Sequence, residues 1–310
     1  MNTTVKMGKM KLKNPVMAAS GTFGPEYNEL VDIKALGAVV AKTITLKPRQ
    51  GNPPPRLVET AAGMINSIGL ENPGLEGFIK EKLPQLLKFK IPVIASISAD
   101  TTEEFKEMAR KLSKTDISGI ELNLSCPNIR GQKTEDRGQR TERALIAQDV
   151  EATYNAVKAV RKETNKTLIA KLTPNVTDIT EIAKAAEDAG SDAISLVNTF
   201  MAMAVDIETR TPKLGNITGG LSGPAIKPMA LKMVWDVFNK VSIPIIGIGG
   251  IMSYKDALEF IICGAAAVQV GTANFVNPKA AIEIIDGIEK YLKINKIDDI
   301  KKLIGALKTK

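Results

Sequence analysis

Short apolar runs alternate with longer amphipathic segments along almost the whole chain. The runs are rich in Val, Ile, Leu and Ala and lack strict polar alternation, which is typical of strands buried on both faces of a parallel sheet. The pattern predicts eight such strands, at Pro15–Ser20, Ala38–Thr43, Pro92–Ser98, Gly119–Ser125, Leu168–Thr173, Ala193–Asn198, Pro244–Gly249 and Ala266–Gly271.

Several segments between these runs have the spacing of amphipathic helices, at residues 101–114, 149–164, 178–190 and 253–264. Thr101 and Asp178 stand where an N-cap side chain is favourable. The last two segments end in Gly190 and Gly264, and glycine is the usual residue just beyond a helix end.

Eight strand–helix units in one chain favour a (β/α)8 TIM barrel over an open sheet. Because no low-complexity linker divides the sequence, residues 1–310 are predicted to form a single domain. A hairpin at Val5–Leu12 is expected to close one end of the barrel. The long connections at 44–74, 126–146 and 200–226 are expected as loops on the carboxyl-terminal face, where barrels build active sites.

Composition narrows the class of protein further. No window reaches the about 18 consecutive apolar residues of a membrane span, and the first residues lack the apolar stretch of a signal peptide. The two cysteines, Cys126 and Cys263, are too far apart in sequence to suggest a disulfide framework. A soluble cytoplasmic protein without a membrane partner is expected.

The net charge of +8 does not by itself indicate nucleic-acid binding. Lysines are interleaved with Glu and Asp in the predicted helices, which is more typical of a solvated surface than of a nucleic-acid groove. Aromatic residues make up 4% of the chain and offer no evident stacking platform. No nucleic-acid partner is therefore predicted.

The hexapeptide NLSCPN (123–128) places a thiol between two amides where a strand is expected to end. The chain contains no histidine, the side chain most often used as a base near neutral pH. Cys126 is therefore a leading candidate for proton transfer. Cys263 lies in an apolar helical segment, EFIICGAAA, and is expected to be inert.

Glycines follow the last two predicted strands. Gly249 and Gly250 end the seventh and Gly271 ends the eighth, each before a helical segment. Backbone N–H groups and a helix N-terminus at these positions favour a phosphate, although such glycines can also serve only as tight turns. The Gly-rich run Gly219–Pro228 is expected to lie beside the same phosphate.

Lys42 and Lys171 follow apolar runs at predicted strand ends, so both head groups are expected at the barrel mouth. A single lysine of this kind is more often a salt-bridged structural residue. Two of them on the face that holds the phosphate site favour a functional role, because an ammonium beside a flavin stabilises its reduced, negatively charged form.

Taken together, these motifs resemble those of the class 1 dihydroorotate dehydrogenases, FMN-dependent barrel enzymes of pyrimidine synthesis. The resemblance runs in family order through AASGTFG, AKTIT, NSIGLENPG, NLSCPN, AKLTPN, LVNTF, GGLSGPAIKP, IGIGGI and VGTANF, over most of residues 14–276. It implies oxidation of dihydroorotate to orotate, with FMN as hydride acceptor.

The resemblance also implies site residues. It makes Cys126 the general base and predicts no metal site. The implied FMN contacts are Ser20, Lys42, Thr43, Asn123, Lys171, Val197, Gly223, Gly249, Gly250, Gly271 and Thr272. The implied contacts to dihydroorotate or orotate are Lys42, Asn66, Ser67, Ile68, Gly69, Leu70, Asn123, Asn128, Asn198 and Thr199.

Glu71, in GLENPG, resembles the NAD-linked class 1B form, whose catalytic subunit pairs with a partner that carries FAD and an iron–sulfur cluster. This chain has no cysteine cluster for such a centre, so the resemblance places it on a partner subunit. A homodimer, or a heterotetramer built on one, is the family expectation.

Two positions depart from the family pattern. The segment after Asn128, IRGQKTEDRGQRTERALIAQD, lacks the usual Phe-Gly of a substrate-covering loop. Ser96 stands where the family usually has an Asn that contacts FMN. Lid behaviour therefore does not follow from the resemblance, and no FMN contact is assigned to Ser96.

Other functions remain open at this level. Within flavin chemistry they are a fumarate-linked class 1A enzyme and a reductase of uracil or thymine. A non-redox aldolase or isomerase would use the phosphate site for its substrate and Lys171 for a Schiff base. A non-catalytic flavin-binding or scaffold protein is a further alternative.

Overall fold

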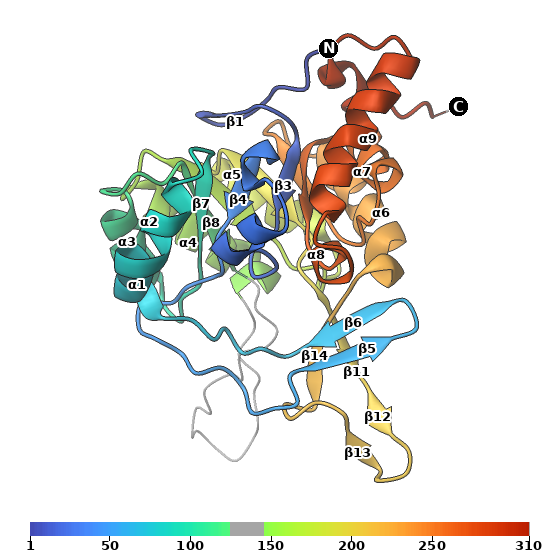
Figure 1. The fold of residues 1–310 in the computed structure, drawn as a ribbon. Coiled ribbons are helices and arrows are strands. Elements are labelled where there is room, and N and C mark those ends of the chain that lie inside the picture. Colours follow the sequence, from blue (N-terminus) through green and yellow to red (C-terminus); the bar gives the residue numbers. More distant parts are fainter. Residues whose placement is uncertain (125–145, 310) are drawn as a thin grey trace.

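A computed structural model describes residues 1–124 and 146–309, and within them eight parallel strands close into a barrel (Figure 1). The strands follow one another around the barrel in chain order, and β16 closes the ring by pairing with β3. All eight predicted strands are confirmed. They are β3 (Val16–Ala18), β4 (Ala38–Val40), β7 (Val93–Ile97), β8 (Gly119–Asn123), β9 (Thr167–Lys171), β10 (Ala193–Leu196), β15 (Ile245–Ile248) and β16 (Ala265–Val270).

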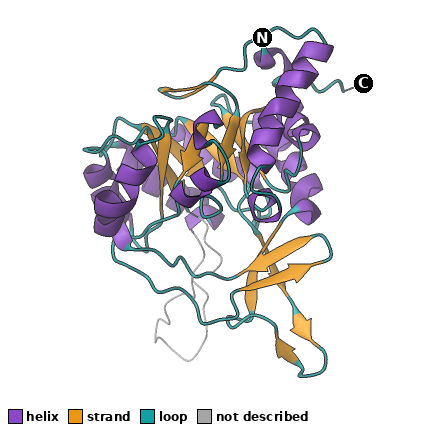
Figure 2. Ribbon diagram, in the orientation of Figure 1, coloured by secondary structure: helices purple, strands orange, loops and turns teal. Residues whose placement is uncertain are grey.

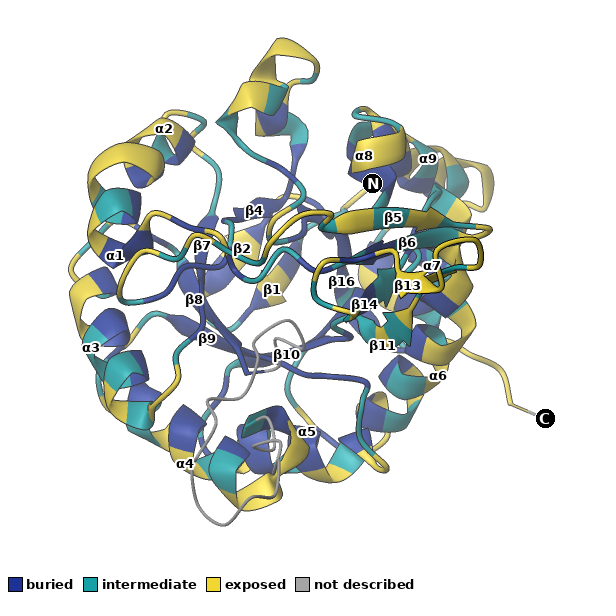
Figure 3. Ribbon diagram, turned by 90° about the horizontal axis from the view of Figure 1, so that it is seen from below, coloured by how far each residue is buried: buried dark blue, intermediate teal, exposed yellow. Residues whose placement is uncertain are grey.

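The barrel strands are buried on both faces, as their unbroken apolar runs predict. Every residue of β7, β8 and β9 is buried. Figure 3 shows this buried ring inside a circle of helices whose exposed residues face outward. Most strands end earlier than the pattern predicts; β4, for example, ends at Val40 rather than Thr43. The residues beyond these ends leave the ladder and line a cavity.

Helices cover the outside of the barrel (Figure 2). In α3 the buried residues Phe105, Met108, Ala109 and Leu112 form the i, i+3, i+4, i+7 stripe of a helix packed on one face. The helices are α1 (Gly74–Gly77), α2 (Leu83–Leu87), α3 (Thr102–Leu112), α4 (Val150–Arg161), α5 (Ile179–Asp188), α6 (Lys227–Phe238), α7 (Tyr254–Ile262), α8 (Ala273–Val276) and α9 (Ala280–Ile294).

The predicted helix ends are confirmed. The Thr101 side chain accepts a hydrogen bond from the Glu104 N–H at 3.2 Å, and Asp178 accepts one from Thr180 at 2.8 Å. Gly190 and Gly264, just beyond α5 and α7, have φ of 99° and 117°, a conformation that glycine adopts at little cost.

The first strand–helix unit differs from the prediction. The connection between β3 and β4 contains only short 3-10 turns, at Pro25–Glu29 and Ile33–Ala35. Gly24 and Pro25 open the first turn, and Asp32 caps the second through the Lys34 N–H. These turn-forming residues leave no room for a longer helix before β4 begins at Ala38.

The predicted N-terminal hairpin is confirmed and lies at the amino-terminal end of the barrel. It pairs β1 (Val5–Met7) with β2 (Met10–Leu12). The Lys9 N–H donates to Thr167 Oγ1 at 3.1 Å, at the first residue of β9. Both chain termini lie at this same end in Figure 1, opposite the carboxyl-terminal ends of the barrel strands.

Two of the three long connections are not simple loops. Together they form a four-stranded antiparallel sheet that projects from the carboxyl-terminal face (Figure 1). Gly219 allows the close pairing in this sheet, since a Cβ there would lie 2.6 Å from the Asn66 carbonyl oxygen. The strands are β5 (Leu57–Thr60), β6 (Gly63–Asn66), β11 (Phe200–Met203) and β14 (Thr218–Ser222), and a ribbon of β12 (Val205–Asp206) and β13 (Thr211–Pro212) follows β11.

The third connection, expected at 126–146, lies almost entirely outside the described residues. In the described part of the chain, no helix combines the length and the apolarity that crossing a bilayer requires.

Candidate functional site

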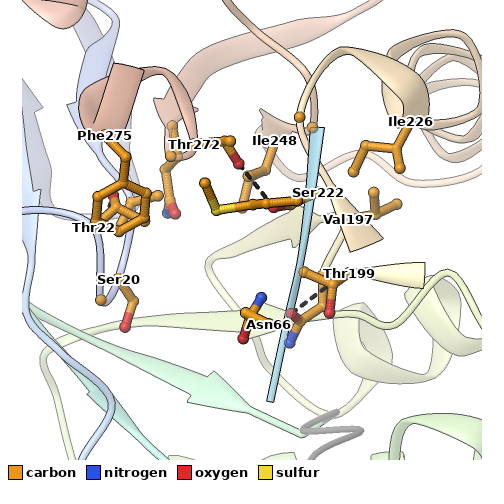
Figure 4. A pocket seen from close by; sticks show the side chains of 18 of the residues that line it. Ser20, Thr22, Asn66, Val197, Thr199, Ser222, Ile226, Ile248, Thr272 and Phe275 are labelled. Atoms are coloured by element: carbon orange, nitrogen blue, oxygen red, sulfur yellow. Dashed lines mark hydrogen bonds between the residues drawn. The ribbon is translucent and has the colours of Figure 1, made fainter. Parts of the chain in front are cut away.

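A cavity of about 240 Å³ opens at the carboxyl-terminal ends of the barrel strands. Strand ends form its floor, and the projecting sheet supplies part of its wall through Asn66 and Ser222. In Figure 4, Thr22 and Phe275 lie on one side of the cavity and Val197 and Ile226 lie on the other. This is the position at which barrels of this type place their active sites.

The structure brings most of the predicted site residues together around this cavity. Ser67 does not line it: the residue is buried and its Oγ accepts a hydrogen bond from Asn52 Nδ2 at 3.1 Å. Cys126 and Asn128 lie outside the described residues. The predicted residues that line the cavity are Ser20, Lys42, Thr43, Asn66, Ile68, Gly69, Leu70, Asn123, Lys171, Val197, Asn198, Thr199, Gly223, Gly249, Gly250, Gly271 and Thr272.

Hydroxyl groups at three neighbouring strand ends form a chain of hydrogen bonds beside the cavity. Thr43 Oγ1 lies 3.0 Å from Ser20 Oγ and 2.9 Å from Ser96 Oγ. Asn123 Nδ2 donates to Thr43 Oγ1 at 3.4 Å. Ser96 is 1% exposed, and its hydrogen bond fixes the orientation of the Thr43 side chain. Ser96 thus supports a cavity residue without lining the cavity itself.

Asn123 and Asn198 form a second group of polar side chains. Asn198 Nδ2 donates to Asn123 Oδ1 at 3.1 Å, and Asn198 Oδ1 accepts from the Thr199 N–H at 2.9 Å. Asn66, on the projecting sheet, donates from Nδ2 to the Gly220 carbonyl at 3.2 Å. An amide carries both a donor and an acceptor, so this arrangement suits a planar ring whose edge alternates the two.

The two predicted lysines have different surroundings. Lys42 packs along Gly21, where a Cβ would lie 3.1 Å from Nζ and 3.2 Å from Cδ. Lys171 is more deeply placed, with its Nζ 3.7 Å from Oε1 of the fully buried Glu121. Both line the cavity, so it has positive charge at two of its strand ends.

The glycines after β14 and β15 form a cradle that a larger residue would fill. Gly223, Gly249 and Gly250 have φ of 95°, 133° and 67°. A Cβ at Gly250 would lie 2.8 Å from the Gly223 carbonyl oxygen, and one at Gly249 would lie 2.7 Å from Ala230 Cβ. The backbone can therefore come this close only without side chains, which fits the prediction of a phosphate site.

Helix α7 begins directly after this cradle and is firmly capped. Ser253 and Asp256 form a reciprocal capping box. Asp256 also pairs with Lys227 of α6 at 2.6 Å. Burial alone would raise the pKa of Asp256, but its hydrogen bonds with Lys227 and Ser253 outweigh this and lower it. The carboxylate thus joins α6 and α7 behind the glycines.

Several cavity residues are absent from the predicted contacts, among them Ser222, Gln269 and Phe275. Ser222 Oγ accepts a hydrogen bond from Oγ1 of the predicted residue Thr272 at 2.9 Å, a contact shown dashed in Figure 4, and Phe275 stands at the rim. Gln269 lies at the floor near the end of β16. Its signal was present in the sequence, because it is the one polar residue in the run AAAVQV.

The described residues hold no group of three or more His, Cys, Asp or Glu side chains arranged to bind a metal ion.

Comparison with known proteins gives a consistent result. The family model described as dihydroorotate dehydrogenase matches residues 2–292. A protein of Thermoanaerobacter pseudethanolicus named dihydroorotate dehydrogenase B (NAD(+)), catalytic subunit, is 52% identical over 310 residues, which cover 99% of each chain. Proteins with the same name from Caldicellulosiruptor saccharolyticus and Geotalea uraniireducens are 53% and 50% identical over 309 residues, covering at least 98% of each chain.

Proposed function

Because the chain belongs to the dihydroorotate dehydrogenase family, we propose that it oxidises dihydroorotate to orotate in pyrimidine biosynthesis, with bound FMN as the electron acceptor. The observation that carries this proposal is that one cavity is lined by a glycine cradle, two lysines and a set of amide side chains. The cradle suits a phosphate, and the amides suit a pyrimidine ring.

FMN supplies the acceptor for two electrons when it is bound. In this proposal backbone N–H groups of Gly223, Gly249 and Gly250 would hold its phosphate, since a Cβ at any of these positions would lie within 2.8 Å of a neighbouring residue and force this backbone apart. The hydroxyl chain from Ser20 through Thr43 and the side chain of Lys171 would face the flavin ring. The family is flavin-dependent, and this lining fits FMN.

The substrate side of the cavity follows from its amides and from Lys42. Orotate carries a carboxylate, and the Lys42 ammonium group is a suitable counter-charge for it. Asn66, Asn123 and Asn198 would pair with the ring edge. A ligand that leaves these polar groups without partners pays their desolvation cost, which gives the site its selectivity.

Cys126 is proposed as the general base. It follows Asn123 by three residues in the sequence, and Asn123 is both the last residue of β8 and a cavity residue. The sequence offers no histidine for this role. Taking a proton from the substrate carbon beside the one that gives up hydride leaves the ring double bond of orotate.

The electron acceptor is proposed to be NAD, reached through a partner subunit that carries FAD and an iron–sulfur cluster. The relatives' names specify NAD(+) and a catalytic subunit, which favours this form over a fumarate-linked enzyme. A heterotetramer built on a homodimer, located in the cytoplasm, belongs to the same proposal.

Replacing Gly250 by alanine tests whether the cradle holds FMN. Wild-type protein is expected to take up one FMN per chain and turn yellow. We expect Gly250→Ala to weaken FMN binding at least tenfold, because its Cβ would collide with Gly223 and Lys227 at 2.8 Å. FMN titration followed by flavin fluorescence measures the change.

Gly190→Ala is the control for backbone strain, because Gly190 also has a positive φ, 99° against 67° at Gly250, and lies at the end of α5, away from the cavity. Both variants should lose about 1–2 kcal/mol of stability, but only Gly250→Ala should lose FMN affinity. Equal FMN affinity in the two variants, or a wild-type protein that takes up no FMN, would contradict the proposed site.

A further inference from the structure

A carboxylate is buried inside the barrel, directly beneath the cavity. Glu121 lies on β8, two residues before the cavity residue Asn123, and has no solvent exposure. Glutamate is almost never fully buried unless it is paired, because removing its charge from water is costly. The function proposed above assigns this residue no role.

One carboxylate oxygen of Glu121 is satisfied by neutral side chains. Oε2 accepts hydrogen bonds from Ser195 Oγ at 3.1 Å and from Gln269 Nε2 at 2.9 Å. Gln269 is on β16, which lies four strands from β8 in either direction around the barrel. Glu121 therefore reaches across the barrel interior and contacts the underside of a cavity residue.

The other oxygen faces a charge. Among the described residues, Oε1 of Glu121 has no hydrogen-bond partner, and it lies 3.7 Å from Nζ of Lys171. A neutral glutamine at position 121 would serve Ser195 and Gln269 equally well through its carbonyl oxygen. Of these contacts, only the one between Oε1 and the Lys171 ammonium group depends on the negative charge of Glu121.

We propose that Glu121 is a positioning residue that acts through Lys171: it holds the ammonium group at the cavity wall, offsets its positive charge and so lowers the reduction potential of the bound flavin. This inference rests on the proposed function, which places FMN against Lys171. Reduction of a flavin by two electrons and one proton adds one negative charge. A buried carboxylate opposes that charge strongly, because little solvent screens it.

A lowered potential fits the proposed electron acceptor. NAD is a weak oxidant, so a flavin that passes electrons on towards NAD needs a low reduction potential. Lys171 alone would stabilise the reduced flavin. With Glu121 beneath it, the lysine can orient the ring while the net charge of the pair stays near zero.

The test is the midpoint potential of FMN bound to the Glu121→Gln variant, measured anaerobically against a reference dye without substrate. We expect the preference for reduced over oxidised FMN to rise about tenfold, which for a two-electron couple is a positive shift of about 30 mV. FMN affinity and the visible spectrum of the oxidised protein, measured beside it, report whether the site is intact.

Ser195→Ala is the matched control, since it removes a hydrogen bond to the same carboxylate without changing any charge. Its midpoint potential should equal that of the wild type. An unchanged potential in Glu121→Gln, or the same shift in both variants, overturns the proposal, because either result means that Glu121 acts only as a structural hydrogen-bond acceptor.

Glu121→Asp keeps the charge but draws it back from Lys171. If Glu121→Gln does not fold, the midpoint potential of Glu121→Asp is the test. A positive shift smaller than the one expected for Glu121→Gln supports the proposal, and an unchanged potential overturns it. A wild-type protein that takes up no FMN would overturn the proposed function together with this inference. FMN bound with an unchanged potential in the variants would overturn this inference alone.

Discussion

Replacing Cys126 with serine is expected to slow reduction of bound FMN by dihydroorotate about 10³-fold near pH 7, while FMN stays bound. A general base contributes about 10²–10⁴-fold to a proton transfer. A hydroxyl is a far weaker acid than a thiol, so very little of its basic form exists near neutral pH. Stopped-flow absorbance of the flavin under anaerobic conditions measures this step directly. The slowed rate should increase with rising pH.

Cys263→Ala is the matched control for Cys126→Ser. Cys263 lies at the end of α7 and is 8% exposed. Burial raises the pKa of its thiol, and the negative charge of nearby Glu259 raises it further. It has no contact with the cavity. Flavin reduction in Cys263→Ala should match the wild type. A wild-type rate in Cys126→Ser, or equal slowing in both variants, would refute the assignment of the base.

The second large effect concerns protein stability. Lys171→Met is expected to lower the free energy of unfolding by about 3–5 kcal/mol, because it leaves the carboxylate of Glu121 buried without its counter-charge. The Lys171 side chain is 10% exposed and that of Glu121 is fully buried, so water cannot replace the lost ammonium. Urea unfolding of the FMN-free protein measures the loss without reference to activity.

Two further variants isolate the charge pair. The double variant Lys171→Met with Glu121→Gln should regain most of the lost stability, since no uncompensated charge remains in the barrel. Lys42→Met, which removes the other, more exposed cavity lysine, should cost much less. If Lys171→Met unfolds at the wild-type urea concentration, the two groups are not energetically coupled and the proposed action of Glu121 through Lys171 is wrong.

The barrel itself could be predicted from the sequence because its strands are continuous apolar runs. The run Pro92–Ser98 predicts β7 to within one residue at each end. Ala38–Thr43 overshoots β4 by three residues, because Lys42 and Thr43 continue the run in sequence but turn into the cavity in space. In this fold the residues just beyond a strand end continue the apolar run in sequence but line the cavity, so the run does not mark where the strand stops.

The projecting sheet could not be predicted in the same way. β14 reads TGGLS, a composition that favours a loop, yet Gly219 and Gly220 are what let it pair closely between β6 and β11. The strands that it joins are more than 100 residues apart in sequence. Pairing over such distances leaves no local pattern that distinguishes it from a long connection.

Among the site residues, those at strand ends could be predicted and those that act across the barrel could not. Asn123 and Lys171 follow apolar runs and belong to recognisable motifs. Glu121 and Gln269 are single polar residues within buried strands, and their meaning depends on meeting each other from opposite sides of the barrel. Ser67, which the resemblance predicts as a substrate contact, does not line the cavity and accepts a hydrogen bond from Asn52 instead.

Anaerobic mixing of the FMN-loaded protein with dihydroorotate tests the proposed reaction without any electron-transfer partner. The yellow flavin absorbance should bleach, and one orotate should form for each flavin reduced. Dihydrouracil, which lacks the carboxylate that Lys42 is proposed to bind, should bleach it far more slowly. A flavin that stays yellow with dihydroorotate, or that bleaches equally with both compounds, would refute dihydroorotate as the substrate of this site.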